Sequence, residues 1–237
     1  MANRALSSLR AEVYTRLAES GSGFYTDAEI NQWLTDGVRD VSVTVEPLET
    51  TATVTTVTST QEYLLPQDTL SIRRADYLGT NSVWYALTET TWQSLYQRDP
   101  DWINATTGAP EQWYWRQANV IGVTPAPSAT YAGAAKLRIL YTYLPAAMSG
   151  DTSVTGLPEW LDDTVVLFAV YRGYLKDRDF QRAQATSQEY SRGVSEGSIK
   201  LNRQRKQSAP RLVPDMGPYR TYWSRGRRSG IIRVQDS

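Results

Sequence analysis

Residues 50–60 read TTATVTTVTST, and this segment decides the fold class. Nearly all of its side chains are β-branched or small, and such side chains favour a pleated strand over a helix. The residues before it place apolar side chains at helical spacing, whereas several more strand-like runs follow it. The chain therefore changes from helix to strand at about residue 49.

Two amphipathic helices are predicted ahead of this segment. The first spans residues 3–20 and is ended by Gly21 and Gly23. The second begins at Thr26, whose hydroxyl can accept a hydrogen bond from an exposed amide while Glu29 reaches back to the cap, as in a capping box. The apolar stripes are Leu6, Leu9, Val13 and Leu17 in the first helix and Ile30, Trp33, Leu34, Val38 and Val41 in the second. The two helices predict a helical hairpin at the start of the chain.

Strand-like runs occupy the middle of the chain. They cover residues 50–60, 62–65, 70–77, 83–87, 113–123 and 137–143. In the last run Leu137, Ile139 and Tyr141 recur with the period of two that a half-buried strand requires. A short helix is expected around residues 91–96, and the prolines at 125 and 127 mark a turn between hairpins.

Helical spacing returns at Pro158 and continues to about Asn202. Proline suits the first turn of a helix, where its missing N–H costs nothing. The buried stripe is expected at Leu161, Val165, Phe168 and Leu175, and from Asp179 onward at Phe180, Ala183, Tyr190 and Val194. Gly193 and Gly197 are expected to weaken the last helix by about 1 kcal/mol each.

This order of elements predicts an α+β fold. A helical bundle built from the N- and C-terminal helices carries an inserted antiparallel β-sheet region, and an extended C-terminal arm follows. The predicted boundaries are 1–48 for the N-terminal helical hairpin, 49–150 for the inserted β-rich domain, 151–202 for the C-terminal helices that complete the helical domain, and 203–237 for the arm. The arm is rich in Pro, Gly, Arg and aromatic residues without helical periodicity, so we expect it to be extended on its own.

The composition excludes most enzyme classes. The chain has no cysteine and no histidine, which rules out thiolate nucleophiles, imidazole bases and nearly every zinc site. Asp162 and Asp163 are poor candidates for paired carboxylates, because adjacent helix positions do not face each other and both suit the first turn of a helix. Asp99 with Asp101 is an equally weak pair. We therefore expect no enzyme activity, no catalytic residue, no metal and no cofactor.

The charge is distributed unevenly along the chain. Residues 203–237 hold nine Lys or Arg and two Asp, a net charge of +7, whereas the remaining residues carry a net charge of −7. The N-terminal stretch MANRALSSLRAEVY has no uninterrupted apolar run, which argues against a signal peptide or a membrane span. An acidic body with a basic end predicts a soluble protein that contacts a partner through its C-terminus.

Several short motifs occur in a characteristic order. They are LRAEVY (9–14) and YTDAEINQWL (25–34) in the first helices, YLLP (63–66), GAP (108–110), WY (113–114), VIGVTPAP (120–127) and LYTY (140–143) in the middle, and LPEW (157–160) and KDRD (176–179) in the closing helices. In this order the motifs resemble the tailed-bacteriophage head-to-tail adaptor family, also called connector or head completion proteins. The resemblance covers residues 5–200.

The resemblance implies a structural subunit of a phage neck, located in the virion and assembled in the host cytoplasm. Such subunits form a homo-oligomeric ring, usually a dodecamer, between the portal protein and a tail or nozzle/stopper protein. The genomic DNA passes through the lumen, so transient contact with it is expected. The C-terminal arm would dock on the portal, and its arginines and aromatics are residue types favoured at interface centres. The residues expected to contact the portal are Arg220, Tyr222, Trp223, Arg225, Arg227, Arg228, Ile231 and Ile232.

Other interpretations remain open from the residues alone. The arm could be a solvated tail, or its arginines and aromatics could bind nucleic acid, although an acidic body suits duplex binding poorly. Ile231 to Val234 could add a strand to a partner's sheet edge. An alternative function is a tail- or fibre-associated carbohydrate-binding module built on the clustered tryptophans. These are Trp84, Trp92, Trp102, Trp113 and Trp115, of which Trp113 and Trp115 are expected to share the core face of a strand.

Overall fold

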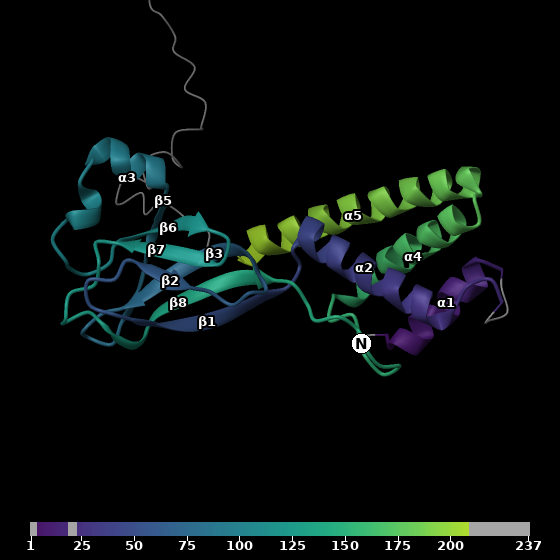
Figure 1. The fold of residues 1–237 in the computed structure, drawn as a ribbon, viewed down its shortest axis with the longest axis horizontal. Coiled ribbons are helices and arrows are strands. Elements are labelled where there is room, and N and C mark those ends of the chain that lie inside the picture. Colours follow the sequence, from purple (N-terminus) through teal and green to yellow (C-terminus); the bar gives the residue numbers. More distant parts are fainter. Residues whose placement is uncertain (1–3, 19–22, 209–237) are drawn as a thin grey trace, which may run out of the picture. The chain divides into compact units, whose positions relative to one another are not determined.

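The computed structural model describes residues 4–18 and 23–208 of the 237-residue chain (Figure 1). The helices are α1 (Leu6–Arg16), α2 (Asp27–Val45), α3 (Trp92–Arg98), α4 (Asp162–Lys176) and α5 (Phe180–Ser208), with 3-10 turns at Trp102–Asn104 and Glu159–Leu161. The strands are β1 (Glu49–Thr56), β2 (Glu62–Leu64), β3 (Thr69–Leu78), β4 (Trp84–Ala86), β5 (Thr88–Thr90), β6 (Gln112–Gln117), β7 (Val120–Thr124) and β8 (Gly133–Tyr143). The predicted α+β class is confirmed.

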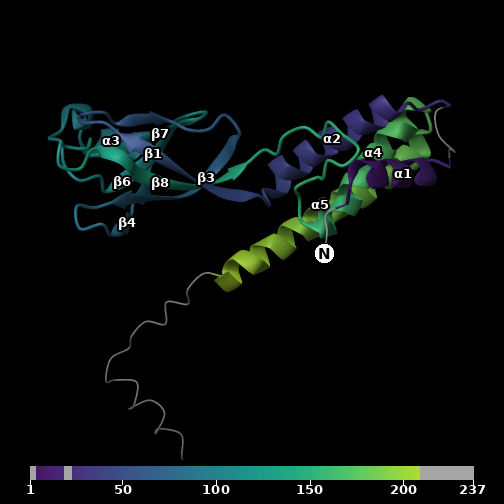
Figure 2. The same ribbon diagram turned by 90° about the horizontal axis from the view of Figure 1, so that it is seen from below.

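The helices from both ends of the chain form one bundle, as predicted. Figure 2 shows α1 lying against α4, and α2 also packs on α4. The core combines most of the predicted stripes of both ends and includes Leu9, Leu34, Val38, Leu161 and Val165, all almost fully buried. Burying each such side chain stabilises the fold by roughly 1.5–3 kcal/mol. Packing contacts between residues more than 100 positions apart in the sequence therefore hold the bundle together. The prediction is wrong at Phe180, which is 67% exposed at the first residue of α5.

The helical hairpin at the start differs from its prediction at both ends of the first helix, since Arg4 and Ala5 are not helical and α1 begins at Leu6. The capping box is present: Thr26 Oγ1 accepts from the Glu29 N–H at 3.3 Å, and a Glu29 carboxylate oxygen accepts from the Thr26 N–H at 3.0 Å. The first helix is shorter than predicted, because α1 ends at Arg16 and Ala18 already adopts a positive φ of 56°. The predicted end at Gly21 lies outside the described residues.

The strands form two four-stranded sheets. The first has the order β1-β8-β3-β4, and the second has the order β2-β7-β6-β5. All neighbouring strands are antiparallel except β5 and β6, which are parallel. The prediction of an antiparallel sheet region is thus confirmed for every pair but one.

Residues 113–123 form two strands rather than one run. β6 and β7 pair antiparallel, with Trp113 opposite Val123 and Trp115 opposite Ile121. The chain reverses at Ala118 and Asn119, and Asn119 takes the positive φ of 60° that Asn tolerates in tight turns. The prediction missed this turn because it lies between two apolar segments without Gly or Pro to mark it.

The two sheets share one apolar core. Leu137, Ile139 and Tyr141 of β8 point into it, which confirms the predicted period of two. Ile121 and Val123 enter from the second sheet and are fully buried. The core therefore lies between the two sheets, as in a β-sandwich.

The last helix is longer than predicted. α5 continues to Ser208, so residues 203–208, assigned to the arm from the sequence, are helical. The other domain boundaries stay predictions, and residues 209–237 of the predicted arm lie outside the described residues. No helix in the described part of the chain is long and apolar enough to cross a membrane.

Candidate assembly surfaces

The edge of the first sheet is formed by β1. Glu49 to Val54 pair in regular register with Thr142 to Leu137 of β8, and a bulge follows between Val54 and Thr56. On its other side β1 has no strand partner among residues 4–18 and 23–208. The outward N–H and C=O groups between Thr50 and Val54 can therefore pair with a strand of another chain.

An apolar groove of about 730 Å³ runs beside this edge. It is lined by β1 on one side and by β2 with Leu65 and Pro66 on the other, so it separates the edge strands of the two sheets. Tyr63 and Leu65 are buried, whereas Leu64 is 80% exposed. The groove has the form of a seam between two sheets that no described strand closes.

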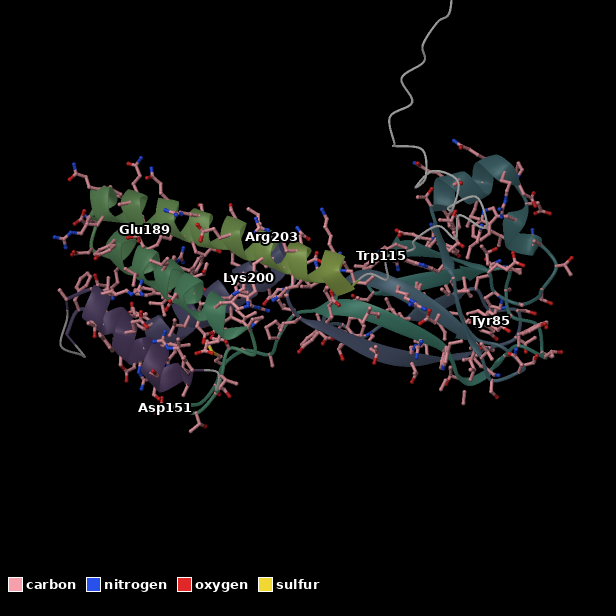
Figure 3. The ribbon with its side chains drawn as sticks, turned by 180° about the vertical axis from the view of Figure 1, so that it is seen from behind. Tyr85, Trp115, Asp151, Glu189, Lys200 and Arg203 are labelled. Carbon is pink, nitrogen blue, oxygen red and sulfur yellow. The ribbon has the colours of Figure 1, made fainter. Side chains whose placement is uncertain are left out.

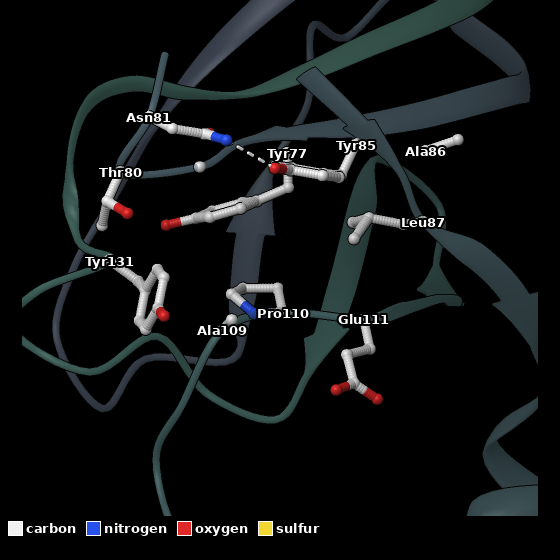
Figure 4. A pocket seen from close by; sticks show the side chains of 11 residues that line it. Tyr77, Thr80, Asn81, Tyr85, Ala86, Leu87, Ala109, Pro110, Glu111 and Tyr131 are labelled. Carbon is white, nitrogen blue, oxygen red and sulfur yellow. Dashed lines mark hydrogen bonds between the residues drawn. The ribbon is translucent and has the colours of Figure 1, made fainter. Parts of the chain in front are cut away.

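A second hollow, of about 450 Å³, is rich in tyrosine (Figure 4). Tyr77, Tyr85 and Tyr131 line it together with Pro110, and Asn81 Nδ2 donates to the Tyr85 hydroxyl at 2.7 Å. Burial raises the pKa of Tyr77. Flat aromatic walls with a few polar groups suit a compact ring, such as the pyrrolidine of a proline or an aromatic side chain.

A third hollow, of about 400 Å³, lies along α4 and α5. Gly193 and Gly197 of α5 border it, and charged side chains of both signs surround it, including Glu189, Arg192 and Lys200. Glu189 and Lys200 project from the surface of α5 (Figure 3). The mixed charges give this surface no preference for one class of ligand.

Glu29 of α2 forms an ion pair with Lys176 of α4. Lys176 Nζ donates to both Glu29 carboxylate oxygens at 2.8 Å and also lies 4.7 Å from the Phe24 ring centroid. The Lys176 hydrogen bond, followed by those from Thr26, lowers the pKa of Glu29 to about 2. The carboxylate serves as cap and ion-pair partner, so its charge has a structural role.

Asp162 and Asp163 are separated by their surroundings rather than paired. Asp162 is 1% exposed and accepts a hydrogen bond from Thr155 Oγ1 at 2.8 Å. Burial raises its pKa, while Thr155 and Arg4 act in the opposite direction. Asp163 is exposed and pairs with Arg4 at 3.2 Å. The two carboxylates share no cavity in which both could act on one substrate.

Asp99 and Asp101 stabilise a turn. An Asp99 carboxylate oxygen accepts from the Asp101 N–H at 2.9 Å, and Asp101 accepts from Asn104 Nδ2 at 2.6 Å. Among the residues that the structure describes, no group of His, Cys, Asp and Glu could hold a metal ion. These acids therefore have a local structural explanation.

The clustered tryptophans do not form an exposed platform. Trp102 and Trp113 are 3% and 4% exposed, and Trp102 stacks edge-on against Trp92 at 4.8 Å between ring centroids. The guanidinium groups of Arg138 and Arg116 lie 4.4 and 3.9 Å above the Trp84 and Trp92 rings. Burial takes Trp102 and Trp113 away from solvent, and a guanidinium covers one face of Trp84 and one face of Trp92.

Trp115 departs from its prediction. It was expected to share the core face of a strand with Trp113, but it is 36% exposed (Figure 3). β6 ends at Gln117 with a register shift after Trp115, so the strand leaves the core at that point. The shared face is therefore buried at Trp113 only.

All eight residues predicted to contact the portal lie outside the described residues. They are Arg220, Tyr222, Trp223, Arg225, Arg227, Arg228, Ile231 and Ile232. The predictions about them stay untested by the structure. The surfaces that sequence reasoning missed are the β1–β2 groove and the tyrosine hollow, because each joins residues from separate strands.

The acids discussed above have local structural roles, and the open features found among residues 4–18 and 23–208 are a sheet edge and shallow grooves. One fold can host many functions, so the class of protein is taken from the family match. Residues 4–215 match the family model described as SU10 adaptor protein, and the chain belongs to this family. The head-to-tail adaptor family expected from the sequence is confirmed.

Two solved structures are similar to the chain at a low level. One, from the neck of the empty GTA particle computed with C6 symmetry, is 17% identical over 73% of this chain and 80% of that chain, with a TM-score of 0.29. The other, from the neck of the native GTA particle computed with C12 symmetry, is 12% identical over 74% and 84%, with a TM-score of 0.27. No curated protein matches the chain. The family match alone identifies the chain.

Proposed function

We propose that the chain is a structural subunit of a phage neck whose copies close into a ring, a dodecamer, between the portal and a tail or nozzle protein. The observation that carries this proposal is the match to an adaptor family over residues 4–215. The subunit performs no reaction. It joins the portal to the tail through the surfaces that it buries against its partners.

The free edge of β1 supports the ring. Exposed edges invite pairing with other chains, and a closed assembly covers them. A head-to-tail contact that closes by rotation uses one surface of each copy against a different surface of the next. A ring therefore accounts for an edge that a monomeric protein would protect.

The uneven charge supports contact with the portal through the C-terminus. Residues 209–237 hold six arginines and two aspartates, a net charge of +4, and the rest of the chain has a net charge of −4. Arginine and aromatic side chains are enriched at interface hot spots. In this proposal Arg220, Tyr222 and Trp223 contact the portal together with the arginines at 225, 227 and 228.

The test compares the full chain with a variant that ends at Ser208. The three apolar clusters that the structure describes lie within residues 4–208, so the variant should keep its circular dichroism spectrum and cooperative unfolding. Mixed with the portal, the full chain should co-sediment and form a ring visible by negative-stain electron microscopy. The truncated chain should not co-sediment. If it binds the portal as well as the full chain does, the proposed role of the C-terminus is wrong.

A further inference from the structure

The edge strand β1 carries few of the features that normally protect an exposed edge, namely Glu49 at one end and the bulge between Val54 and Thr56 at the other. Natural edge strands carry Lys, Pro or inward-pointing charges, or they are very short. β1 is eight residues long, contains no Lys, Arg or Pro, and has Glu49 as its single charge. Six residues, Glu49 to Val54, pair regularly before the bulge. This edge can accept another strand along most of its length.

The groove beside β1 adds an apolar binding surface to that edge. Val57 and Leu64 are 55% and 80% exposed, although both are large apolar side chains. Ala52 and Val54 of β1 face the core side of the sheet and are half-buried. A strand added to β1 would place every second side chain over this groove.

We propose that Ile231-Ile232-Arg233-Val234 of one copy pairs as a strand with β1 of a neighbouring copy. This inference rests on the proposed ring. It assigns Ile231 and Ile232, which were expected from the sequence to contact the portal, to the neighbouring subunit instead and leaves the portal contact to residues 220–228. Ile232 and Val234 enter the groove, while Arg233 faces the outer side with Thr51, Thr53 and Thr55.

The composition of the segment favours this occupant. Three of its four residues are β-branched and apolar, which suits a strand that has one face on an apolar groove. Its surroundings are complementary in charge, since residues 209–237 carry +4 and the acceptor region 49–150 carries eight acids and six bases. The segment and the groove therefore match in apolar pattern, and the two larger regions that contain them carry opposite net charge.

The length of the chain allows the segment to reach another copy. Ile231 lies 23 residues beyond Ser208, the end of α5. An extended chain of that length spans up to about 75 Å at roughly 3.3 Å per residue. The distance is comparable with the size of a whole subunit of this length, so a neighbour in a ring is within reach.

Disulfide trapping tests the pairing cleanly because the chain has no cysteine of its own. One full-length copy carries Arg233→Cys, and a second full-length copy carries a tag of different mass. The second copy has one of three substitutions, Thr51→Cys, Thr53→Cys or Thr55→Cys. Testing the three separately covers the possible registers of the added strand. Directly opposed strand residues bring their Cβ atoms to a distance that a disulfide can span. After mild oxidation, a non-reducing gel should show a mixed dimer with at least one of the three.

The matched control is Tyr85→Cys on β4, the edge at the other side of the same sheet. Tyr85 is 50% exposed, so its accessibility resembles that of the threonines. The mixed dimer should be several-fold weaker with this variant. Equal linking to both edges, linking to neither, or a dominant dimer between two β1 cysteines would each overturn the proposal, the last because β1 would then pair with β1.

A failure of the strand pairing can be distinguished from a failure of the proposed portal contact. Ile232→Asp with Val234→Asp should abolish the mixed dimer, because charged side chains oppose entry into the apolar groove. Co-sedimentation of the same variant with the portal should persist. If the chain binds the portal but gives no mixed dimer, the strand pairing alone is wrong. If the dimer forms without portal binding, the portal contact is wrong.

Discussion

Glu29 makes two contacts with one carboxylate, and its charge should govern the acid stability of the helical bundle. Its pKa is about 2 in the folded chain and 4.5 ordinarily. A lowered pKa means that the stabilisation is complete above about pH 4.5 and is lost as the pH falls towards 2. Glu29→Gln keeps a side chain that can cap Thr26 but removes the charge that holds Lys176.

We therefore expect Glu29→Gln to lower the free energy of unfolding at pH 7 and to flatten its fall between pH 4.5 and 2. Urea unfolding followed by circular dichroism at several pH values measures both. Glu189→Gln, an exposed carboxylate of α5, is the control and should keep the wild-type acid profile. An unchanged profile in Glu29→Gln would show that the ion pair with Lys176 contributes nothing.

At the scale of elements, α5 contains two glycines that look unfavourable in a helix. An alanine in place of a helical glycine ordinarily stabilises by about 1 kcal/mol. At Gly193, however, a Cβ atom would lie 2.8 Å from Thr164 Oγ1 and 3.2 Å from its Cγ2. Thr164 is buried on α4 and β-branched, so it has little freedom to move away. The glycine allows α5 to approach α4.

Gly193→Ala should therefore destabilise the chain, by about 1–3 kcal/mol as for other overpacked sites. Ser195→Ala, at an exposed position of the same helix, should change the free energy of unfolding by no more than about 0.5 kcal/mol. The comparison of the two variants uses the midpoints of their denaturant unfolding curves, provided that the dependence of the free energy of unfolding on denaturant concentration is the same for both. A stabilising Gly193→Ala would mean that α4 and α5 are not packed closely in solution.

At the scale of the whole molecule, charge should control the approach to the portal. Arg225→Gln, Arg227→Gln and Arg228→Gln together reduce the net charge of residues 209–237 from +4 to +1. Portal binding should weaken, and its dependence on salt should become shallower, because fewer charges are left to be screened. Sedimentation or interferometry over a series of salt concentrations measures both effects.

The control for this prediction changes the net charge by the same amount elsewhere. Arg39→Gln, Arg98→Gln and Arg182→Gln lie on exposed positions of α2, α3 and α5. This triple variant should keep most of the salt dependence of the unaltered chain. If both triple variants lose binding equally, net charge alone would explain the effect and the C-terminal arginines would have no special role.

Features that depend on neighbours along the chain could be derived from the sequence alone. The Thr26–Glu29 capping box, the apolar stripes of α2 and α4 and the period of two in β8 all follow from residues within one or two turns of each other. The order helix, strand, helix then determined the α+β class, and the ordered motifs pointed to the adaptor family. These conclusions needed no knowledge of distant contacts.

Tertiary structure decided what depends on residues far apart in the sequence. The β6–β7 turn at Asn119, the parallel pairing of β5 with β6, the burial of Asp162 and the open seam between β1 and β2 each require knowing which strand or helix lies alongside. Gly193 shows the same limit, since its cost or benefit is set by Thr164, 29 positions away. Local propensity is a property of a segment, whereas pairing and burial arise only when separate segments meet and exclude water.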